Sequence, residues 1–148
     1  GIQENTRSNS IIYPDNTQLH IKLANLYQHQ KKIDRAADQY KKILILNPSH
    51  TSSLYDLGVC FALLDEHEKS ISTFDRLITI DPENLLAHYK LAGQHAVLNN
   101  QKKAIESLKK ALHLGFNNWS QIKYDKNLDN IRQTKYYLDI VKKNILDR

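Results

Sequence analysis

The sequence predicts an all-α chain, a right-handed superhelical array of antiparallel helix pairs closed by C-terminal capping helices. Three observations support this fold class. Residue types repeat at a spacing of 34 positions, apolar residues within each copy recur at helical spacing, and the chain has only four Gly and three Pro in 148 residues. A helix pair of this length leaves one apolar face uncovered, so stacking buries that face against the next copy.

The three copies begin at Thr17, Thr51 and Leu85, which gives predicted repeats at 17–50, 51–84 and 85–118. Small residues at two positions of each copy let paired helices approach closely, and large residues at two others fill the space between pairs. The matched positions hold Leu23, Leu57 and Leu91; Ala24, Gly58 and Ala92; Tyr27, Phe61 and His95; Ala36, Ser70 and Ala104; Tyr40, Phe74 and Leu108; and Pro48, Pro82 and Phe116.

The helix boundaries follow from turn and cap residues. The first helix is expected to begin near Asp15 or Asn16, which are good N-cap residues before an amphipathic run. Polar residues at 28–32 form its turn, and Asn47-Pro48 ends its partner, because a residue before proline avoids the helical region.

The later pairs follow the same plan. Polar residues at 65–68 and Asn99-Asn100 mark their turns, and Asp81-Pro82 stops the second pair. Gly115 is expected to end the third pair in the left-handed conformation.

Two segments lie outside the repeats. Residues 1–14 are polar and are interpreted as a flexible leader, whose apolar residues 11–13 are expected to dock on the first repeat. Residues 119–148 do not match a fourth copy. We interpret them as the cap that a stacked array needs at its end, with helices near 119–123, 127–132 and 134–146.

Charge and cysteine content exclude few classes of function by themselves. The net charge is +5, but the Lys doublets are scattered and separated by acidic residues, which favours solvated faces over a phosphate-binding patch. Cys60 is alone in a helical stretch and is expected to be a buried structural thiol. No apolar run approaches the ~20 residues of a membrane span, and no signal peptide is present.

Catalytic and metal-binding motifs are absent from the sequence. It contains no Gly-rich phosphate loop, paired-Cys motif or His-Glu-x-x-His motif, and its seven His do not combine with other ligands on one helical face. We therefore expect no catalytic residue, no metal site and no cofactor.

The repeated pattern resembles the tetratricopeptide repeat over residues 17–118. The chain departs from that family at His20, His88, His95 and Phe116. The segment 114–137, with Asp129-Asn130-Ile131-Arg132 and Tyr136-Tyr137, looks like the tail that closes many bacterial proteins of this family. The resemblance implies a non-catalytic protein-interaction module, a scaffold or adaptor.

In that family, the first helix of each pair lines the concave side of the array. The corresponding positions here are Ile21, Asn25, Gln28, His29, Ser52, Tyr55, Val59, Leu63, Leu86, Tyr89, Gly93 and Val97, with Asp56 and Lys90 beside them. Because these positions are mostly apolar, we expect them to hold an extended peptide or an amphipathic helix of a partner protein. The predicted contacts are Ile21, Asn25, Tyr55, Val59, Leu86, Tyr89 and Lys90. The alternative is that the leader or the C-terminal helix of the chain covers this surface.

One function of the family is not expected here. Co-chaperones that grip a C-terminal carboxylate use a Lys/Asn/Asn/Lys/Arg set, which maps onto Ile21, Asn25, Asp56, Leu86 and Lys90. Only Asn25 and Lys90 suit a carboxylate, and Asp56 would repel it. The resemblance therefore does not imply chaperone-tail binding of this type.

The sequence leaves several other functions open. The chain could be a basic module that binds nucleic acid or an anionic surface through its Lys doublets. It could also be an accessory domain of a larger envelope-anchored protein that stabilises a partner, or a unit that self-associates through bare repeat ends. Specific nucleic-acid binding is not expected. The compartment is open as well: the sequence fits a soluble cytoplasmic domain, or one anchored in the cell envelope if a signal precedes Gly1.

Overall fold

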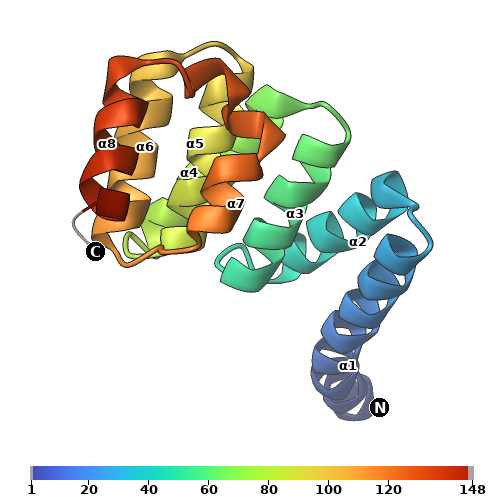
Figure 1. Cartoon of the computed structure of the whole chain (residues 1–148). Coiled ribbons are helices and arrows are strands. Elements are labelled where there is room, and N and C mark those ends of the chain that lie inside the picture. The colour runs from blue at the N-terminus through green and yellow to red at the C-terminus, as the bar shows by residue number, and fades with distance from the viewer. Residues whose placement is uncertain (1, 147–148) are drawn as a thin grey trace.

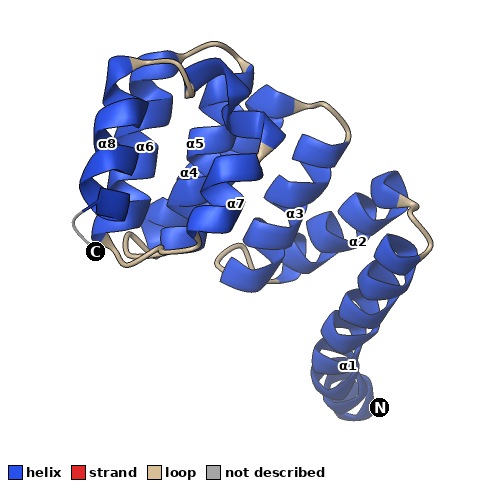
Figure 2. Cartoon of the chain, viewed as in Figure 1, coloured by secondary structure: helices blue, strands red, loops and turns tan. Residues whose placement is uncertain are grey.

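The computed structural model of the chain describes the backbone of residues 2–146 and the side chains of residues 16–144. Its helices stack in chain order and curve from one end of the molecule to the other (Figure 1). They are α1 Ile2–His29, α2 Ile33–Leu46, α3 Thr51–Leu63, α4 His67–Ile80, α5 Leu85–Val97, α6 Gln101–His113, α7 Trp119–Tyr124, the 3-10 helix η1 Lys126–Ile131 and α8 Lys135–Leu146. Residues 2–146 contain helices and loops but no strand, which confirms the predicted fold class (Figure 2).

Two predicted starts are confirmed, because α3 begins at Thr51 and α5 at Leu85. The residue before each helix caps it. The His50 ring nitrogen Nδ1 accepts a hydrogen bond from the Ser53 backbone N–H at 3.2 Å, and the Asn84 side-chain oxygen accepts one from Ala87 N–H at 3.0 Å. Each cap satisfies a backbone donor that the first helical turn would otherwise leave unpaired.

The hairpin turns repeat as faithfully as the helices do. Lys31, Asp65 and Asn99 occupy the same position of successive copies, and all three have positive φ, at 58°, 58° and 59°. Asp and Asn tolerate this left-handed conformation better than Lys does. Gly115 has a φ of 105°, as its predicted role at the end of α6 requires.

The small residues sit where the helices of a pair approach closely. Ala24, Ala36, Ala92 and Ala104 are fully buried. A Cβ added at Gly58 would come within 2.7 Å of the Phe74 ring, and the Ser70 hydroxyl donates a hydrogen bond to the Gly58 carbonyl at 2.7 Å. The close packing inferred from the repeated small positions is therefore present.

The start of the first helix was predicted wrongly. α1 begins at Ile2, so residues 2–14, interpreted as a leader, continue the helix with Pro14 inside it. Its N-terminal part projects away from the other helices (Figure 1). Extending an existing helix fixes one residue for each hydrogen bond gained, whereas nucleation fixes several, so good cap residues such as Asp15 and Asn16 need not end the extension. The predicted docking of residues 11–13 lies outside the residues whose side chains are described.

The first helix also forms the N-terminal edge of the stack. Leu19 and Leu26 on α1 are 52% and 51% exposed. Residues at the matching positions of the next two copies are buried, because α2 and α4 pack over them: Ser53, Cys60, Ala87 and Gln94. The first helix lacks such a cover in the described part of the chain.

The C-terminal helices close the other end. α7, η1 and α8 lie close to the predicted ranges 119–123, 127–132 and 134–146. They bury Ile122, Leu128, Ile131 and Tyr137 in a cluster with α5 and α6. No helix among the described residues is long and apolar enough to cross a membrane.

Candidate functional site

The predicted contact residues lie on α1, α3 and α5, and the spacing of 34 relates them to one another. Ile21, Tyr55 and Tyr89 occupy one position of the three copies, and Asn25, Val59 and Gly93 occupy another. We call the surface formed by these two positions and their neighbours on α1, α3 and α5 the inner face. Its first two copies are open, and its third copy is covered.

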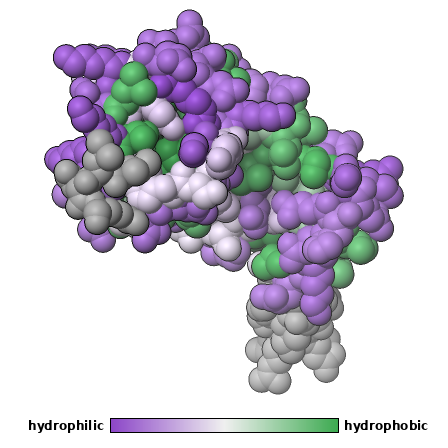
Figure 3. Space-filling model, viewed as in Figure 1, coloured by the Kyte–Doolittle hydropathy of each residue, from purple (hydrophilic) through white to green (hydrophobic). Residues whose placement is uncertain are grey.

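On α3 the inner face exposes apolar side chains. Tyr55 and Val59 are half-buried, and Leu63, one helical turn further on, is 62% exposed. Tyr55 is held from behind by the edge of the Phe74 ring, with ring centres 5.8 Å apart and planes at 65°. Figure 3 shows apolar residues gathered over α3 on the side of the molecule that faces the viewer. On α1, Ile21 is half-buried and Asn25 is exposed.

Polar groups line the junction between α1 and α3. The Tyr40 hydroxyl donates to Asn25 Oδ1 at 3.5 Å, and the Gln28 amide approaches Cys60 Sγ at 3.7 Å. Burial raises the pKa of Asp56, although the nearby Tyr40 hydroxyl acts in the opposite direction. Asp56 is therefore a half-buried acid beside the apolar side chains of α3.

Cys60 is fully buried, as predicted for a structural thiol. Burial also raises the pKa of this thiol. Because the thiolate is the reactive form, the environment of Cys60 does not activate it as a nucleophile.

On α5 the C-terminal segment of the chain covers the inner face. Tyr89 is only 2% exposed, its ring stacks on Phe116 at 4.2 Å, and its hydroxyl donates to Asp125 Oδ2 at 2.7 Å. A Cβ added at Gly93 would come within 3.1 Å of Asn127 Cβ on η1. Tyr89 was wrongly predicted as an accessible contact, because Phe116, Asp125 and η1 pack over this part of α5. Leu86 remains 47% exposed and Lys90 half-buried at the border of this region.

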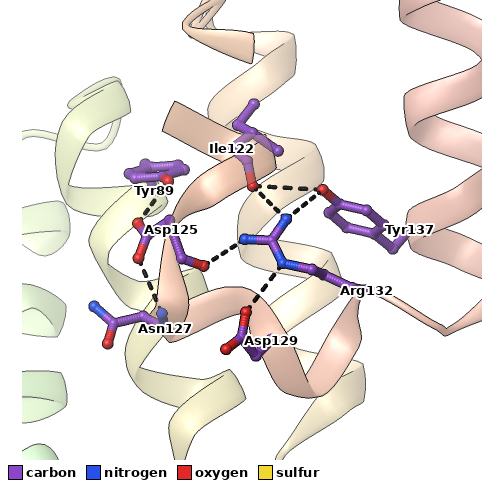
Figure 4. Close-up of polar contacts among 7 residues, drawn as sticks. All are labelled: Tyr89, Ile122, Asp125, Asn127, Asp129, Arg132 and Tyr137. Carbon is purple, nitrogen blue, oxygen red and sulfur yellow. Dashed lines mark hydrogen bonds and ion pairs between the residues drawn. The ribbon is translucent and has the colours of Figure 1, made fainter. Parts of the chain in front are cut away.

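Arg132 holds the folded-back segment together (Figure 4). Its guanidinium donates to the carbonyls of Ile122 and Asp125 at 2.8 and 2.5 Å, to the Tyr137 hydroxyl at 2.9 Å and to Asp129 Oδ1 at 3.1 Å. One side chain thereby ties α7, η1 and α8 to one another. The planar fork of donors in arginine makes such a multiple contact possible, whereas a lysine could not reproduce its geometry.

Two further hydrogen bonds fix the end of η1 on the third repeat. The Asn130 amide donates to the Ala96 carbonyl at 2.9 Å, and the Gln101 amide donates to the Asn130 carbonyl at 3.1 Å. Sequence reasoning identified Asn130 and Arg132 only as parts of a tail pattern and gave them no contacts. Half of their partners are backbone carbonyls, which have no residue signature.

The described residues hold no group of three or more His, Cys, Asp or Glu that could bind a metal ion. Several histidines instead make structural hydrogen bonds. His20 pairs with Gln39 at 2.7 Å, His67 with Gln94 at 2.8 Å, and His88 with the Pro82 carbonyl at 2.8 Å.

Comparison with known families places the chain among helical repeats. A family model described as tetratricopeptide repeat matches residues 21–84, the first two helix pairs. No curated protein matches the chain significantly.

Solved structures resemble a larger part of the chain. A crystal structure of MamA protein aligns with a TM-score of 0.75 at 18% identity, over 90% of this chain and 73% of that one. The first TPR of Spaghetti (RPAP3), bound to the HSP90 peptide SRMEEVD, aligns with a TM-score of 0.71 at 18% identity, over 80% and 92%. YrrB, described as a TPR protein with an unusual peptide-binding site, aligns with a TM-score of 0.67 at 21% identity, over 72% and 55%. These likenesses extend the shared fold beyond the second helix pair.

Proposed function

Because this chain is a tetratricopeptide repeat protein, with a fold that generally serves protein interaction rather than catalysis, we propose that it binds a peptide or helix of a partner protein on the open inner face of α1 and α3. The proposed contacts are Ile21, Asn25, Tyr55 and Val59, with Leu63 on α3 and with Leu86 and Lys90 at the border of the covered third copy. In this role the chain is a scaffold or adaptor.

The observation that carries this proposal is the state of the third copy. Tyr89 and Gly93, the counterparts of Tyr55 and Val59, are covered by a short stretch of backbone and side chains between Asp125 and Ile131. The chain thus contains one case of this face holding a short helical segment, the 3-10 helix η1. The same face on α3 carries half-buried and exposed apolar side chains with no segment over them in the described part of the chain.

The free energy of burying apolar surface favours a partner segment that covers the apolar side chains of the inner face. Complete burial of an exposed aliphatic side chain contributes about 1.5–3 kcal/mol. Covering Leu63 and the exposed part of Val59 would therefore contribute favourable free energy to binding. Tyr55 is already oriented by Phe74, so binding would immobilise it at little entropic cost. Aromatic side chains held in this way frequently dominate binding energy.

We do not expect the partner of this chain to resemble the peptide in the Spaghetti (RPAP3) structure. The carboxylate-gripping positions hold Ile21, Asp56 and Leu86 where cationic or polar groups are needed. Asp56 instead places a half-buried acid beside the apolar contacts. We therefore expect a partner segment with apolar side chains and no free carboxylate at this point.

Site-specific photo-crosslinking tests the proposal directly. A photoreactive residue at Asn25, which is exposed on the inner face, should give a discrete crosslinked species in native lysate. The same group at Lys42, which is exposed on α2, should not give that species. Val59→Glu in the Asn25-labelled protein should abolish it, because burying the new charge opposes docking.

A matched variant separates loss of binding from general damage. Ile45 is 79% exposed on α2, so Ile45→Glu makes the same change of residue type outside the inner face. It should leave the crosslinked species intact, and circular dichroism should show both variants folded. An equal yield from Val59→Glu and the parent protein would refute binding at this face. Self-association, nucleic-acid or anionic-surface binding and a role within a larger envelope-anchored protein stay predictions.

A further inference from the structure

A second surface lies between α6 and α8, away from the inner face. Two clefts, with volumes of about 540 and 300 Å³, follow the line where these helices lie side by side (Figure 1). Lys109 lines both clefts, and we call the two together the α6–α8 cleft.

Lysines from distant parts of the sequence meet in this cleft. Lys102 and Lys109 come from α6, and Lys135 and Lys143 from α8, and all four are exposed. None of them forms an ion pair within the described residues. Glu106 and Asp139 are the acidic lining residues, so four cations against two anions leave an excess of two positive charges.

The floor of the cleft is apolar. Ile105 is 5% exposed, and Leu112 and Ile140 are half-buried beside it. Tyr136 is 61% exposed at the rim, with Lys109 Nζ 5.1 Å from the centre of its ring. The cleft therefore combines an apolar floor, an exposed aromatic side chain and a basic rim.

We propose that the α6–α8 cleft binds an acidic amphipathic segment of a partner protein. Its apolar side chains would cover Ile105, Leu112 and Ile140, and its carboxylates would pair with the four lysines of the rim. This chemistry fits the cleft better than a phosphate-bearing partner does, because nucleic acid offers no aliphatic side chains for the apolar floor and a lipid surface is flat. The inference is independent of the function proposed for the inner face.

Fluorescence anisotropy with designed peptides tests the proposal on the full chain. The probe is a labelled amphipathic peptide with Leu at helical spacing and Glu on the other face, and its control carries Lys in place of Glu. We expect saturable binding of the Leu/Glu peptide and none of the Leu/Lys peptide. Absence of saturable Leu/Glu binding, or equal binding of both peptides, would overturn the inference.

Protein variants assign the binding to the cleft. Lys109→Glu with Lys143→Glu should weaken the Leu/Glu peptide about tenfold, because two partly desolvated ion pairs become repulsive. Lys32→Glu with Lys42→Glu makes the same charge change on the far repeat and should change affinity less than about twofold. Tyr136→Ala should weaken binding without any change of charge, since it removes apolar contact area. Equal losses in the two double variants, or no loss in either, would contradict binding at the cleft.

Two further probes identify a partner of another class. Vesicles of phosphatidylcholine with phosphatidylserine, and a short DNA duplex, present anionic groups without an apolar peptide face. If either binds in a manner that depends on Lys109 and Lys143 while the Leu/Glu peptide does not bind, the lysines serve a phosphate surface and the inference is wrong. Circular dichroism of each variant verifies that the helices are retained.

Discussion

The second and third repeats present the same surface in opposite states. On α3, Tyr55 and Val59 are only half-buried. On α5, Tyr89 is 2% exposed, and Gly93 packs against Asn127 of the C-terminal segment. The helices share length, register and turn geometry, so the repeat motif does not decide whether its inner face is available. The rest of the chain decides it.

One substitution of residue type and one hydrogen bond account for much of the difference. Glycine at position 93 lets η1 approach the α5 backbone closely. At the matching position of α3, the branched side chain of Val59 occupies this space. Tyr89 finds an acceptor in Asp125, whereas the Tyr55 hydroxyl makes no hydrogen bond in the part of the chain that the structure describes. The third repeat is thus adapted to a fixed cover, and the second is not.

The largest expected effect comes from removing the side chain that holds the cover. Arg132→Ala leaves the Asp125 carbonyl and the Tyr137 hydroxyl without their donor, and leaves the Ile122 carbonyl only the 3.4 Å hydrogen bond from Tyr137. We expect the free energy of unfolding in urea to fall by about 2–4 kcal/mol, because several largely buried acceptors lose a charged partner at once. Arg132→Lys should recover only part of this, since an ammonium cannot reach all the acceptors. A loss below about 0.5 kcal/mol would mean that Arg132 does not hold the segment.

A smaller loss of stability is expected when the matched tyrosines of the third and second repeats are replaced by phenylalanine. Tyr89→Phe removes the hydrogen bond to Asp125 and should lower the free energy of unfolding by about 1–2 kcal/mol. Tyr55→Phe makes the same chemical change at the matching position of α3 and should stay within about 0.5 kcal/mol. Equal losses in the two variants would show that the third repeat gains nothing specific from its cover.

The smallest expected effect concerns pH and another matched pair, Phe61 and His95. Burial lowers the pKa of His95 below 6.5, and Lys103 lowers it further. The folded state therefore disfavours the protonated ring, so its contribution to stability is complete above the unfolded pKa and is lost as pH falls below it. His95→Phe gives the third repeat the residue type of the second. Its melting temperature should drop less than that of the parent between pH 7.5 and 5.5, and identical drops would contradict this origin.

The sequence could predict the helix pairs because their determinants are local and periodic. Small residues such as Gly58 and Ala92 and large ones such as Phe74 recur at fixed intervals, and the structure uses them as inferred. The left-handed turns were partly visible, since Asp65 and Asn99 suit that conformation, whereas Lys31 gives no such indication.

The covered state of the third repeat could not be predicted in the same way. Tyr89 and Tyr55 are identical residues at identical positions, so the pattern assigned both to one accessible surface. What separates them is a segment without any repeat, held in part through backbone carbonyls that Arg132 and Asn130 reach. Such contacts depend on how the chain returns, which residue type and spacing do not encode. The proposed binding role of the first two copies awaits its own test.

The difference between Gly93 and Val59 has a consequence for how many guests the array can hold. A stack of near-identical units offers a tail the chance to slip by one unit and settle on the neighbour. If the C-terminal segment bound α3 instead of α5, Asn127, which packs against Gly93, would clash with Val59. It would also lie beside the acidic Asp56 instead of the basic Lys90. The C-terminal segment therefore stays on α5, and a partner that binds α3 does not have to displace it.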